Sequence, residues 1–245
     1  MLRIHGHRGC RAVYPENSIE GVQAAFACGA FAVEIDVHLT SDDDFIVVHD
    51  GVLHPGYYVL NSSLTVAESS LQNLTAVGFG QQRLEQFPEQ QELSTSVPSL
   101  QELIALFPEQ ENRFIIEVKI EDPSRASSIA KHFANWLKTH AYNPFRVQSF
   151  SLAFLESFHE LMNTVPCHLL IEDKKKLTQL WPSWMSGVGL HKDLIDEAIV
   201  SRAQESRLEL AAWTVNSLEE ARHLMELGVN ELITDAPQLL THLVK

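Results

Sequence analysis

Three carboxylates lie within two short strand-like segments of the sequence. Glu34 and Asp36 belong to the segment FAVEIDV at residues 31–37, and Glu117 belongs to FIIEVKI at 114–120. Side chains two positions apart on a strand share a face, so these acids point away from the face formed by the alternating apolar residues. The apolar face belongs against helices, which leaves the carboxylates pointing inward, where charge must be paired, protonated or metal-bound. Hard oxygen ligands of this kind predict one divalent cation, Mg2+ or Ca2+, in preference to Zn2+.

An alternative interpretation gives the same carboxylates a purely structural role. Lys119 shares the inward face with Glu117, and Arg8 follows an earlier strand-like segment, so both could pair with the acids in an ion network. The three carboxylates lie near the C-terminal ends of their strands, which is where barrel active sites form. This position favours a functional site.

Two histidines are placed to join this site. His7 ends the first strand-like segment, and Arg8-Gly9 after it forms a turn that brings backbone and guanidinium close to a bound group. His49 ends another strand-like segment and is followed by Asp50. Imidazole titrates near neutral pH, so two histidines beside a carboxylate-held cation predict a general acid and a general base.

Strand-like apolar runs alternate with amphipathic helical segments along the whole chain. Eight such strands in 245 residues match a (β/α)8 TIM barrel, an α/β fold that typically takes about 250 residues. A doubly wound sheet is the alternative. The predicted strands cover residues 2–7, 31–37, 114–120, 145–150, 167–172, 187–191, 208–215 and 230–235.

Capping residues mark two of the helices. We expect Asn17 to be the N-cap of the first helix, with Glu20 completing a capping box and Gly29 ending the helix. The same arrangement of Ser, Glu and a terminal Gly recurs in residues 217–228.

One further strand-like run, at residues 45–49, does not fit the alternation. It follows the preceding strand too closely for a parallel crossover, which needs a dozen or more residues. We therefore expect a short antiparallel hairpin arm with its turn at residues 41–44. Residues 51–113 are then a decorated βα connection within a single domain that covers residues 1–245.

The composition limits the classes of partner. Against 32 Asp and Glu the chain has 18 Lys and Arg, giving a net charge of −14 with 45% apolar residues. Nucleic acid and anionic membranes need a basic footprint, so neither is an expected partner. No apolar run is long enough to span a bilayer, which argues against stable membrane insertion. The N-terminus does not resemble a signal peptide and the three cysteines lie far apart, so a cytoplasmic protein is expected.

The sequence also shows a family resemblance that extends from about residue 3 to 238. The ordered set resembles the glycerophosphodiester phosphodiesterase family, although any one of its short motifs is a weak signal. The motifs are His7-Arg8-Gly9, Pro15-Glu16-Asn17, Glu34-Ile35-Asp36, His49-Asp50, Glu117-Val118-Lys119, Ser149-Phe150, Trp213-Thr214-Val215-Asn216 and Thr234-Asp235-Ala236-Pro237.

The resemblance implies a (β/α)8 barrel that hydrolyses a small glycerophosphodiester to glycerol 3-phosphate and an alcohol. It further implies that Glu34, Asp36 and Glu117 hold the cation and that His7 and His49 are the acid–base pair. The residues implied to contact substrate are Arg8 and Lys119 at the phosphate, Glu16 at the metal and glycerol end, and Trp213 on the pocket wall.

Two alternative functions remain open from the sequence. The same barrel and metal centre could cleave a lipid phosphodiester, as in lysophospholipase D-like or sphingomyelinase D-like action, although residues 51–113 show no membrane-seeking helix. A non-catalytic barrel that binds an anion is the other alternative, yet none of the expected carboxylates or histidines is missing. The chain departs from the family pattern at residues 41–44 and 51–58, which affects the expected choice of alcohol group.

Overall fold

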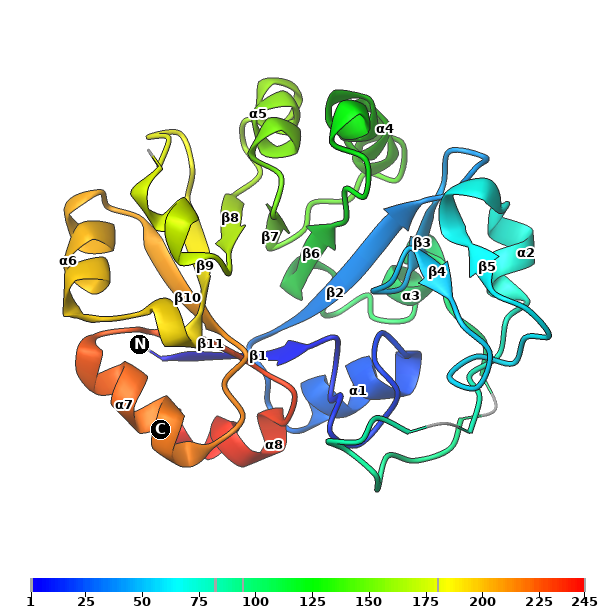
Figure 1. Ribbon diagram of the computed structural model, residues 1–245, viewed down its shortest axis with the longest axis horizontal. Helices are drawn as coiled ribbons and strands as arrows, with labels where there is room; N and C mark the ends of the chain where they lie inside the picture. Colours follow the sequence, from blue (N-terminus) through cyan, green and yellow to red (C-terminus); the bar gives the residue numbers. More distant parts are fainter. Residues whose placement is uncertain (1, 82, 94, 180, 245) are drawn as a thin grey trace.

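In the computed structural model, eight parallel strands close into a barrel. The structure describes residues 2–81, 83–93, 95–179 and 181–244. Around the barrel the strand order is β1, β2, β6, β7, β8, β9, β10 and β11, and β11 pairs with β1 to close the ring (Figure 1). This confirms the predicted TIM barrel over the doubly wound sheet. The barrel strands are β1 (Arg3–His7), β2 (Ala32–Leu39), β6 (Phe114–Val118), β7 (Arg146–Ser149), β8 (Cys167–Ile171), β9 (Gly187–His191), β10 (Glu209–Trp213) and β11 (Glu231–Thr234).

Helices surround the strands on the outside of the barrel (Figure 1). The connection from β8 to β9 differs from the others, because a 3-10 helix takes the place of an α-helix in its described part. The helices that follow barrel strands are α1 (Ile19–Ala27), η3 (Pro123–Arg125), α4 (Ala126–Thr139), α5 (Leu152–Leu161), η4 (Lys174–Thr178), η5 (Lys192–Leu194), α6 (Glu197–Glu205), α7 (Leu218–Leu227), α8 (Pro237–Leu240) and η6 (Thr241–Leu243).

The predicted hairpin arm is present. Strand β3 (Phe45–Val47) runs antiparallel to the end of β2, with Val37 opposite Val47 and Leu39 opposite Phe45. The decorated connection after it contains a small two-stranded sheet and packs around its own apolar cluster, which includes Ile46. Its elements are β4 (Val52–Leu53), β5 (Leu64–Thr65), η1 (Val66–Glu68), α2 (Leu71–Thr75), α3 (Leu100–Ala105) and η2 (Glu111–Arg113).

The alternation predicted for β2 and β6 is observed. Val33, Ile35 and Val37 are fully buried in the main apolar cluster between strands and helices. The carboxylates of Glu34 and Asp36 lie on the opposite face, inside the barrel, with 1% and 0% of their surfaces exposed. Strand periodicity therefore places the acids of β2 inside the barrel.

The prediction for the start of α1 was wrong by one residue. Ser18 is the N-cap, and its hydroxyl accepts a hydrogen bond from the main-chain N–H of Gly21 at 3.1 Å. Asn17 has a left-handed backbone with a φ of 59°, and its side chain is bonded to Asp36 on β2. That tertiary contact removes Asn17 from the capping position. The Ser217–Glu220 capping box of α7 is confirmed, and Gly228 follows the helix with a φ of 103°.

A buried network of charged and histidine side chains fills the N-terminal end of the barrel, away from the predicted site. Arg146 on β7 is 1% exposed, and its Nη1 lies 2.8 Å from Oε2 of Glu231 on β11. His168 Nε2 lies 3.3 Å from Glu209 Oε2, and the neighbouring His5 Nε2 lies 3.2 Å from Glu231 Oε2. Polar groups at this end of a barrel serve stability and not chemistry.

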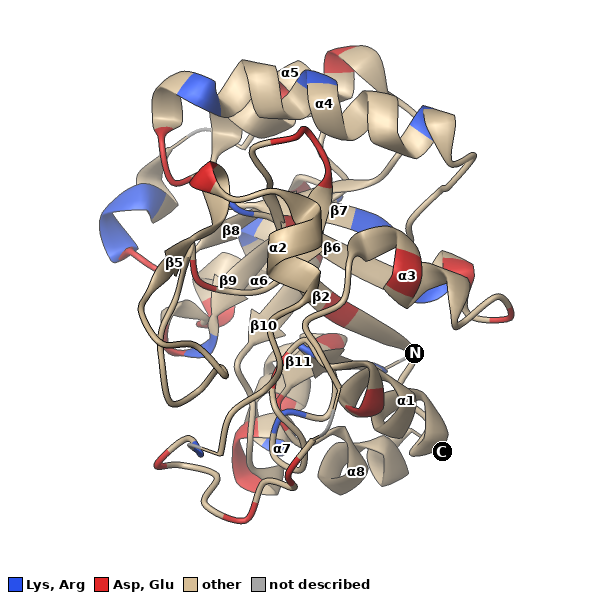
Figure 2. Cartoon of the chain, turned by 90° about the vertical axis from the view of Figure 1, so that its right-hand side faces the viewer, with Lys and Arg blue, Asp and Glu red and all other residues tan. Residues whose placement is uncertain are grey.

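Acidic residues are distributed over several elements of the chain, and red segments in Figure 2 mark helices including α1 and α3. Within the described ranges no helix combines the length and apolar character needed to cross a bilayer.

Candidate active site

A cavity of about 350 Å³ opens at the C-terminal end of the barrel strands. Seven of the nine site residues predicted from the sequence line it, whereas Asp36 lies buried beneath it and Glu16 lies behind Arg8. The lining residues are His7, Arg8, Glu34, His49, Glu117, Lys119, Gln148, Phe150, Leu170, Glu172, Trp213 and Ile233.

The carboxylates of Glu34, Asp36 and Glu117 converge at the base of this cavity. Each offers an oxygen, and these oxygens all lie within 4.8 Å of one another. Glu34 Oε1 is buried without a hydrogen-bond partner. Burial, followed by the charges of Asp36 and Glu117, raises the pKa of Glu34 well above its usual range. A divalent cation would relieve this repulsion, so the donor set fits an oxygen-preferring metal.

Asp36 is the most strongly paired of the three acids. Its Oδ1 lies 2.8 Å from Lys119 Nζ, and its Oδ2 lies 3.1 Å from Arg8 Nε. Burial alone would raise the pKa of Asp36, but these two cations hold it well below its usual range. The ion network considered from the sequence is thus present, and it surrounds the same carboxylates that can hold a metal.

Asn17 fixes the orientation of Asp36 from the loop after β1. Its amide Nδ2 donates to Asp36 Oδ2 at 2.9 Å, and its Oδ1 accepts from the main-chain N–H of Asp36 at 3.1 Å. Asn17 was predicted to cap the following helix, and its role in orienting Asp36 was missed. Its place in the Pro15-Glu16-Asn17 motif was the available signal.

His7 is oriented by a carboxylate at the end of β11. Its Nδ1 lies 2.7 Å from Asp235 Oδ1, which directs Nε2 away from this carboxylate. Asn216 holds Asp235 in turn, since its Nδ2 donates to Oδ2 at 2.7 Å and its Oδ1 accepts the Asp235 main-chain N–H at 2.9 Å. Burial and the charge of Arg8 lower the pKa of His7 despite the Asp235 contact.

His49 reaches the cavity from the end of the hairpin arm. Its Nδ1 lies 2.7 Å from Asp50 Oδ1, and its side chain is 32% exposed. The arm is secured by His38 on β2, whose Nε2 lies 2.9 Å from the main-chain oxygen of His49. His7 and His49 therefore each carry a carboxylate at Nδ1, while their solvent exposure differs.

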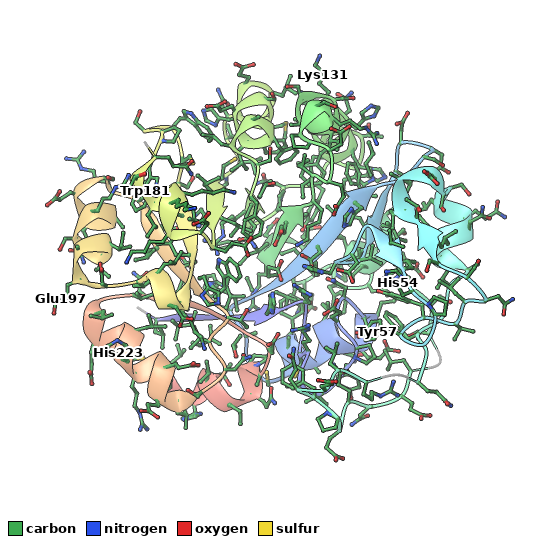
Figure 3. The ribbon with its side chains drawn as sticks, in the orientation of Figure 1. His54, Tyr57, Lys131, Trp181, Glu197 and His223 are labelled. Carbon is green, nitrogen blue, oxygen red and sulfur yellow. The ribbon has the colours of Figure 1, made fainter. Side chains whose placement is uncertain are left out.

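Arg8 connects the carboxylate cluster to Glu16. Its main-chain N–H donates to Glu34 Oε2 at 3.0 Å, and its Nη1 donates to Glu16 Oε2 at 2.9 Å. Arg11 donates to the same Glu16 oxygen at 2.6 Å. Tyr57, labelled in Figure 3, accepts the Glu16 main-chain N–H at 3.1 Å.

The turn that presents Arg8 depends on Gly9. Gly9 has a φ of 91°, and a Cβ there would lie 2.6 Å from the main-chain carbon of Gly21 in α1. Only glycine permits this close approach, which holds the loop against the helix.

Lys119 faces the carboxylates from the end of β6. Its Nζ lies 2.5 Å from Glu117 Oε1 as well as close to Asp36. Trp213 and Phe150 form another wall of the cavity. Their rings meet edge to face with the centroids 5.6 Å apart. The cavity thus has a charged wall from β1, β2 and β6 and an aromatic wall from β7 and β10.

Two histidines without a predicted role lie away from the cavity. His54 and His223, labelled in Figure 3, are exposed and do not line it. The rings of His191 and Trp213 meet edge to face with their centroids 5.4 Å apart, but His191 does not line the cavity.

The model of the glycerophosphoryl diester phosphodiesterase family matches residues 7–239. The chain belongs to this family. The prediction that it is an enzyme of this hydrolase family is confirmed. A glycerophosphodiester phosphodiesterase of Bacillus altitudinis is 24% identical over 97% of this chain and 96% of the relative. One from Bacillus subtilis is 27% identical over 98% of this chain and 85% of the relative.

Solved structures of the family share the fold. A putative glycerophosphoryl diester phosphodiesterase from Silicibacter pomeroyi superimposes with a TM-score of 0.87 at 23% identity, covering 100% of this chain and 93% of that one. An Oleispira antarctica phosphodiesterase, solved in complex with the product sn-glycerol-3-phosphate, gives a TM-score of 0.81 at 20% identity, covering 99% and 97%.

Proposed function

We propose that the protein hydrolyses glycerophosphodiesters to glycerol 3-phosphate and an alcohol. The observation that carries this proposal is the placement of His7 and His49 around one cavity, above three converging buried carboxylates. A barrel that only bound anions would not need two histidines with carboxylate partners.

Glu34, Asp36 and Glu117 would hold one divalent cation, Mg2+ or Ca2+. The unpartnered Glu34 oxygen and the mutual repulsion of the acids support this assignment. When bound, the cation would supply Lewis-acid polarisation of a phosphoryl oxygen and neutralise developing charge.

Arg8 and Lys119 would bind the phosphate. Both are cations at the cavity wall, so they can stabilise the negative charge that grows on the phosphoryl oxygens. Trp213 would form one side of the substrate pocket. Glu16 would act through Arg8, since it accepts a hydrogen bond from that guanidinium and does not line the cavity.

The histidines would divide the proton transfers. One takes the proton from the attacking hydroxyl, which belongs to water or to the glycerol of the substrate, and the other protonates the leaving alkoxide. Attack by the glycerol hydroxyl would form a cyclic phosphate that water then opens. We place the reaction in the cytoplasm, because Cys10, Cys28 and Cys167 are all free thiols.

A substrate panel tests the proposal. Release of glycerol 3-phosphate from glycerophosphocholine, glycerophosphoethanolamine and glycerophosphoglycerol is measured with Mg2+, with Ca2+ and with a chelator. We expect cleavage that the chelator abolishes, and 31P NMR would detect a cyclic intermediate. Replacing His49 with Ala should lower kcat by about 10²- to 10⁴-fold, whereas His223→Ala on exposed α7 should not. Absence of cleavage in every metal would refute the proposal.

A further inference from the structure

One wall of the cavity is aromatic and apolar. Phe150 and Trp213 meet edge to face with an interplanar angle of 88°, so their rings form a corner. Leu170 and Ile233 are apolar neighbours in the same cavity. The proposed hydrolysis assigns no chemical step to this corner.

One acidic side chain accompanies these rings. Glu172 follows the end of β8, lines the cavity and is exposed. It makes no hydrogen bond or ion pair with any residue in the described part of the chain, whereas its neighbour Asp173 caps η4 by accepting the Lys175 N–H at 2.9 Å. Glu172 is therefore free to meet a charge brought by a ligand.

The other acids of the cavity are already occupied. Glu117 is paired with Lys119, and Glu34 accepts the Arg8 main-chain N–H and belongs to the predicted metal site. Glu172 lies at the end of β8, whereas the metal ligands lie on β6 and β2, two and three strands away around the barrel. Among the lining residues that the structure describes, it is the one carboxylate outside the metal site.

A cationic group would suit this wall. An ammonium is attracted by aromatic faces, and methylated ammonium ions also bury apolar surface against them. A carboxylate that lines the same cavity as two aromatic rings adds a direct charge interaction. A neutral polyol head group would gain neither.

Resting on the proposed function, we infer that the Phe150–Trp213 corner and Glu172 bind the alcohol half of the substrate and select a cationic amino-alcohol head group, such as choline or ethanolamine. The glycerol phosphate half lies at the metal and the two histidines. The ammonium half then extends towards β8 and β10. Glu172 is a specificity residue and takes no part in proton transfer.

An anionic head group would instead use Lys176. This lysine lines a neighbouring cavity of about 360 Å³ together with Lys119 and Glu121. That cavity lies over the ends of β6 and β7 and does not include Trp213. Lys176→Gln therefore serves as the variant for the competing specificity.

The test compares two substrates that differ only in charge. Glycerophosphocholine is compared with glycerophospho-3,3-dimethylbutanol, in which carbon replaces the quaternary nitrogen with nearly the same shape. We expect the wild-type protein to favour the choline ester in kcat/KM. Glu172→Gln should lower that preference about three- to tenfold, mainly by raising KM for the choline ester, since the contact is the same in ground and transition states.

Glu160→Gln, the same change at an exposed position on α5, is the matched control and should leave the preference unchanged. Equal cleavage of both esters, or an equal effect of Glu172→Gln on both, would overturn the inference while leaving the proposed hydrolysis intact. A change in preference with Lys176→Gln and none with Glu172→Gln would also overturn it. Cleavage of neither ester would count against the proposed function itself.

Discussion

His7 and Asp235 are 228 positions apart in the sequence, yet Nδ1 of the imidazole lies 2.7 Å from Oδ1 of the carboxylate. The contact joins the ends of β1 and β11, the two strands whose pairing closes the barrel. Barrel closure therefore also fixes the tautomer and orientation of His7, because a carboxylate at Nδ1 keeps the proton there.

We predict that Asp235→Asn lowers kcat by about 10²-fold with a smaller effect on KM, since the amide no longer stabilises the protonated imidazole. Steady-state release of glycerol 3-phosphate measures this. Asp43→Asn is the control, because Asp43 lies 3.5 Å from Nδ1 of His132 in a His–Asp contact remote from the cavity. Equal losses in the two variants would argue against orientation of His7 as the cause.

Asn17 should influence cation affinity. Asn17→Gly keeps the left-handed backbone accessible but removes both hydrogen bonds to Asp36, so Asp36 loses its fixed orientation. We expect binding of Mg2+ or Ca2+ to weaken about 10- to 100-fold, measured by isothermal titration calorimetry. Asn17→Ala should weaken it further, because alanine also strains the backbone at a φ of 59°. Unchanged affinity in Asn17→Gly would contradict the role assigned to the side chain.

The carboxylate cluster should cost stability when no cation is bound. Glu34→Gln removes one of three buried like charges and retains an acceptor for the Arg8 main-chain N–H. Without metal, we expect this variant to be more stable than the wild type by about 1 kcal/mol. At a cation concentration of about 100 Kd the wild type should gain about 2.7 kcal/mol and the order should reverse. Urea denaturation with chelator and with cation would reveal whether the two curves cross.

Stability should fall in acid because of the network at the N-terminal end of the barrel. Burial and Arg146 lower the pKa of His168 to about 4, from the ordinary imidazole value of 6.5. Between these values the unfolded chain binds a proton that the folded chain does not, so the unfolded state is favoured as the pH falls. The loss from this residue amounts to about 3 kcal/mol between pH 7 and pH 4.

The pKa of Glu231 acts in the same direction. Burial would raise it, but Arg146 and His5 hold it below its usual range, and its stabilising effect is lost as the pH falls further. We expect His168→Asn to flatten the pH dependence of the unfolding free energy between pH 7 and 4. His223→Asn, on the exposed face of α7, should leave that dependence unchanged.

Local pattern was sufficient to predict the strands and the inward direction of their acids. The two-residue period of β2 and β6 places Glu34, Asp36 and Glu117 on one face whatever surrounds them. The turn at residues 41–44 was predictable because its length excludes a parallel crossover. These features depend on neighbouring residues alone.

Contacts between distant segments were not predictable in this way. Asn and Ser are both favoured at N-caps, so Asn17 and Ser18 were both candidates. Asp36 on β2 binds the Asn17 side-chain amide, and Ser18 therefore caps the helix. The order of strands around the barrel brings Asn216 to Asp235. It also places Glu172 and Trp213 in one cavity. No local pattern carries that order.

The arm formed by β2 and β3 determines which parts of the site can move. β2 carries Glu34 and Asp36, and its last residues pair with β3, which leads directly to His49. Between Asp36 and His49 the chain thus forms a hydrogen-bonded hairpin, and His38 binds the main-chain oxygen of His49. Separating Asp36 from His49 would require breaking that hairpin. If these residues act as proposed, Glu34, Asp36 and His49 would already be assembled before substrate arrives.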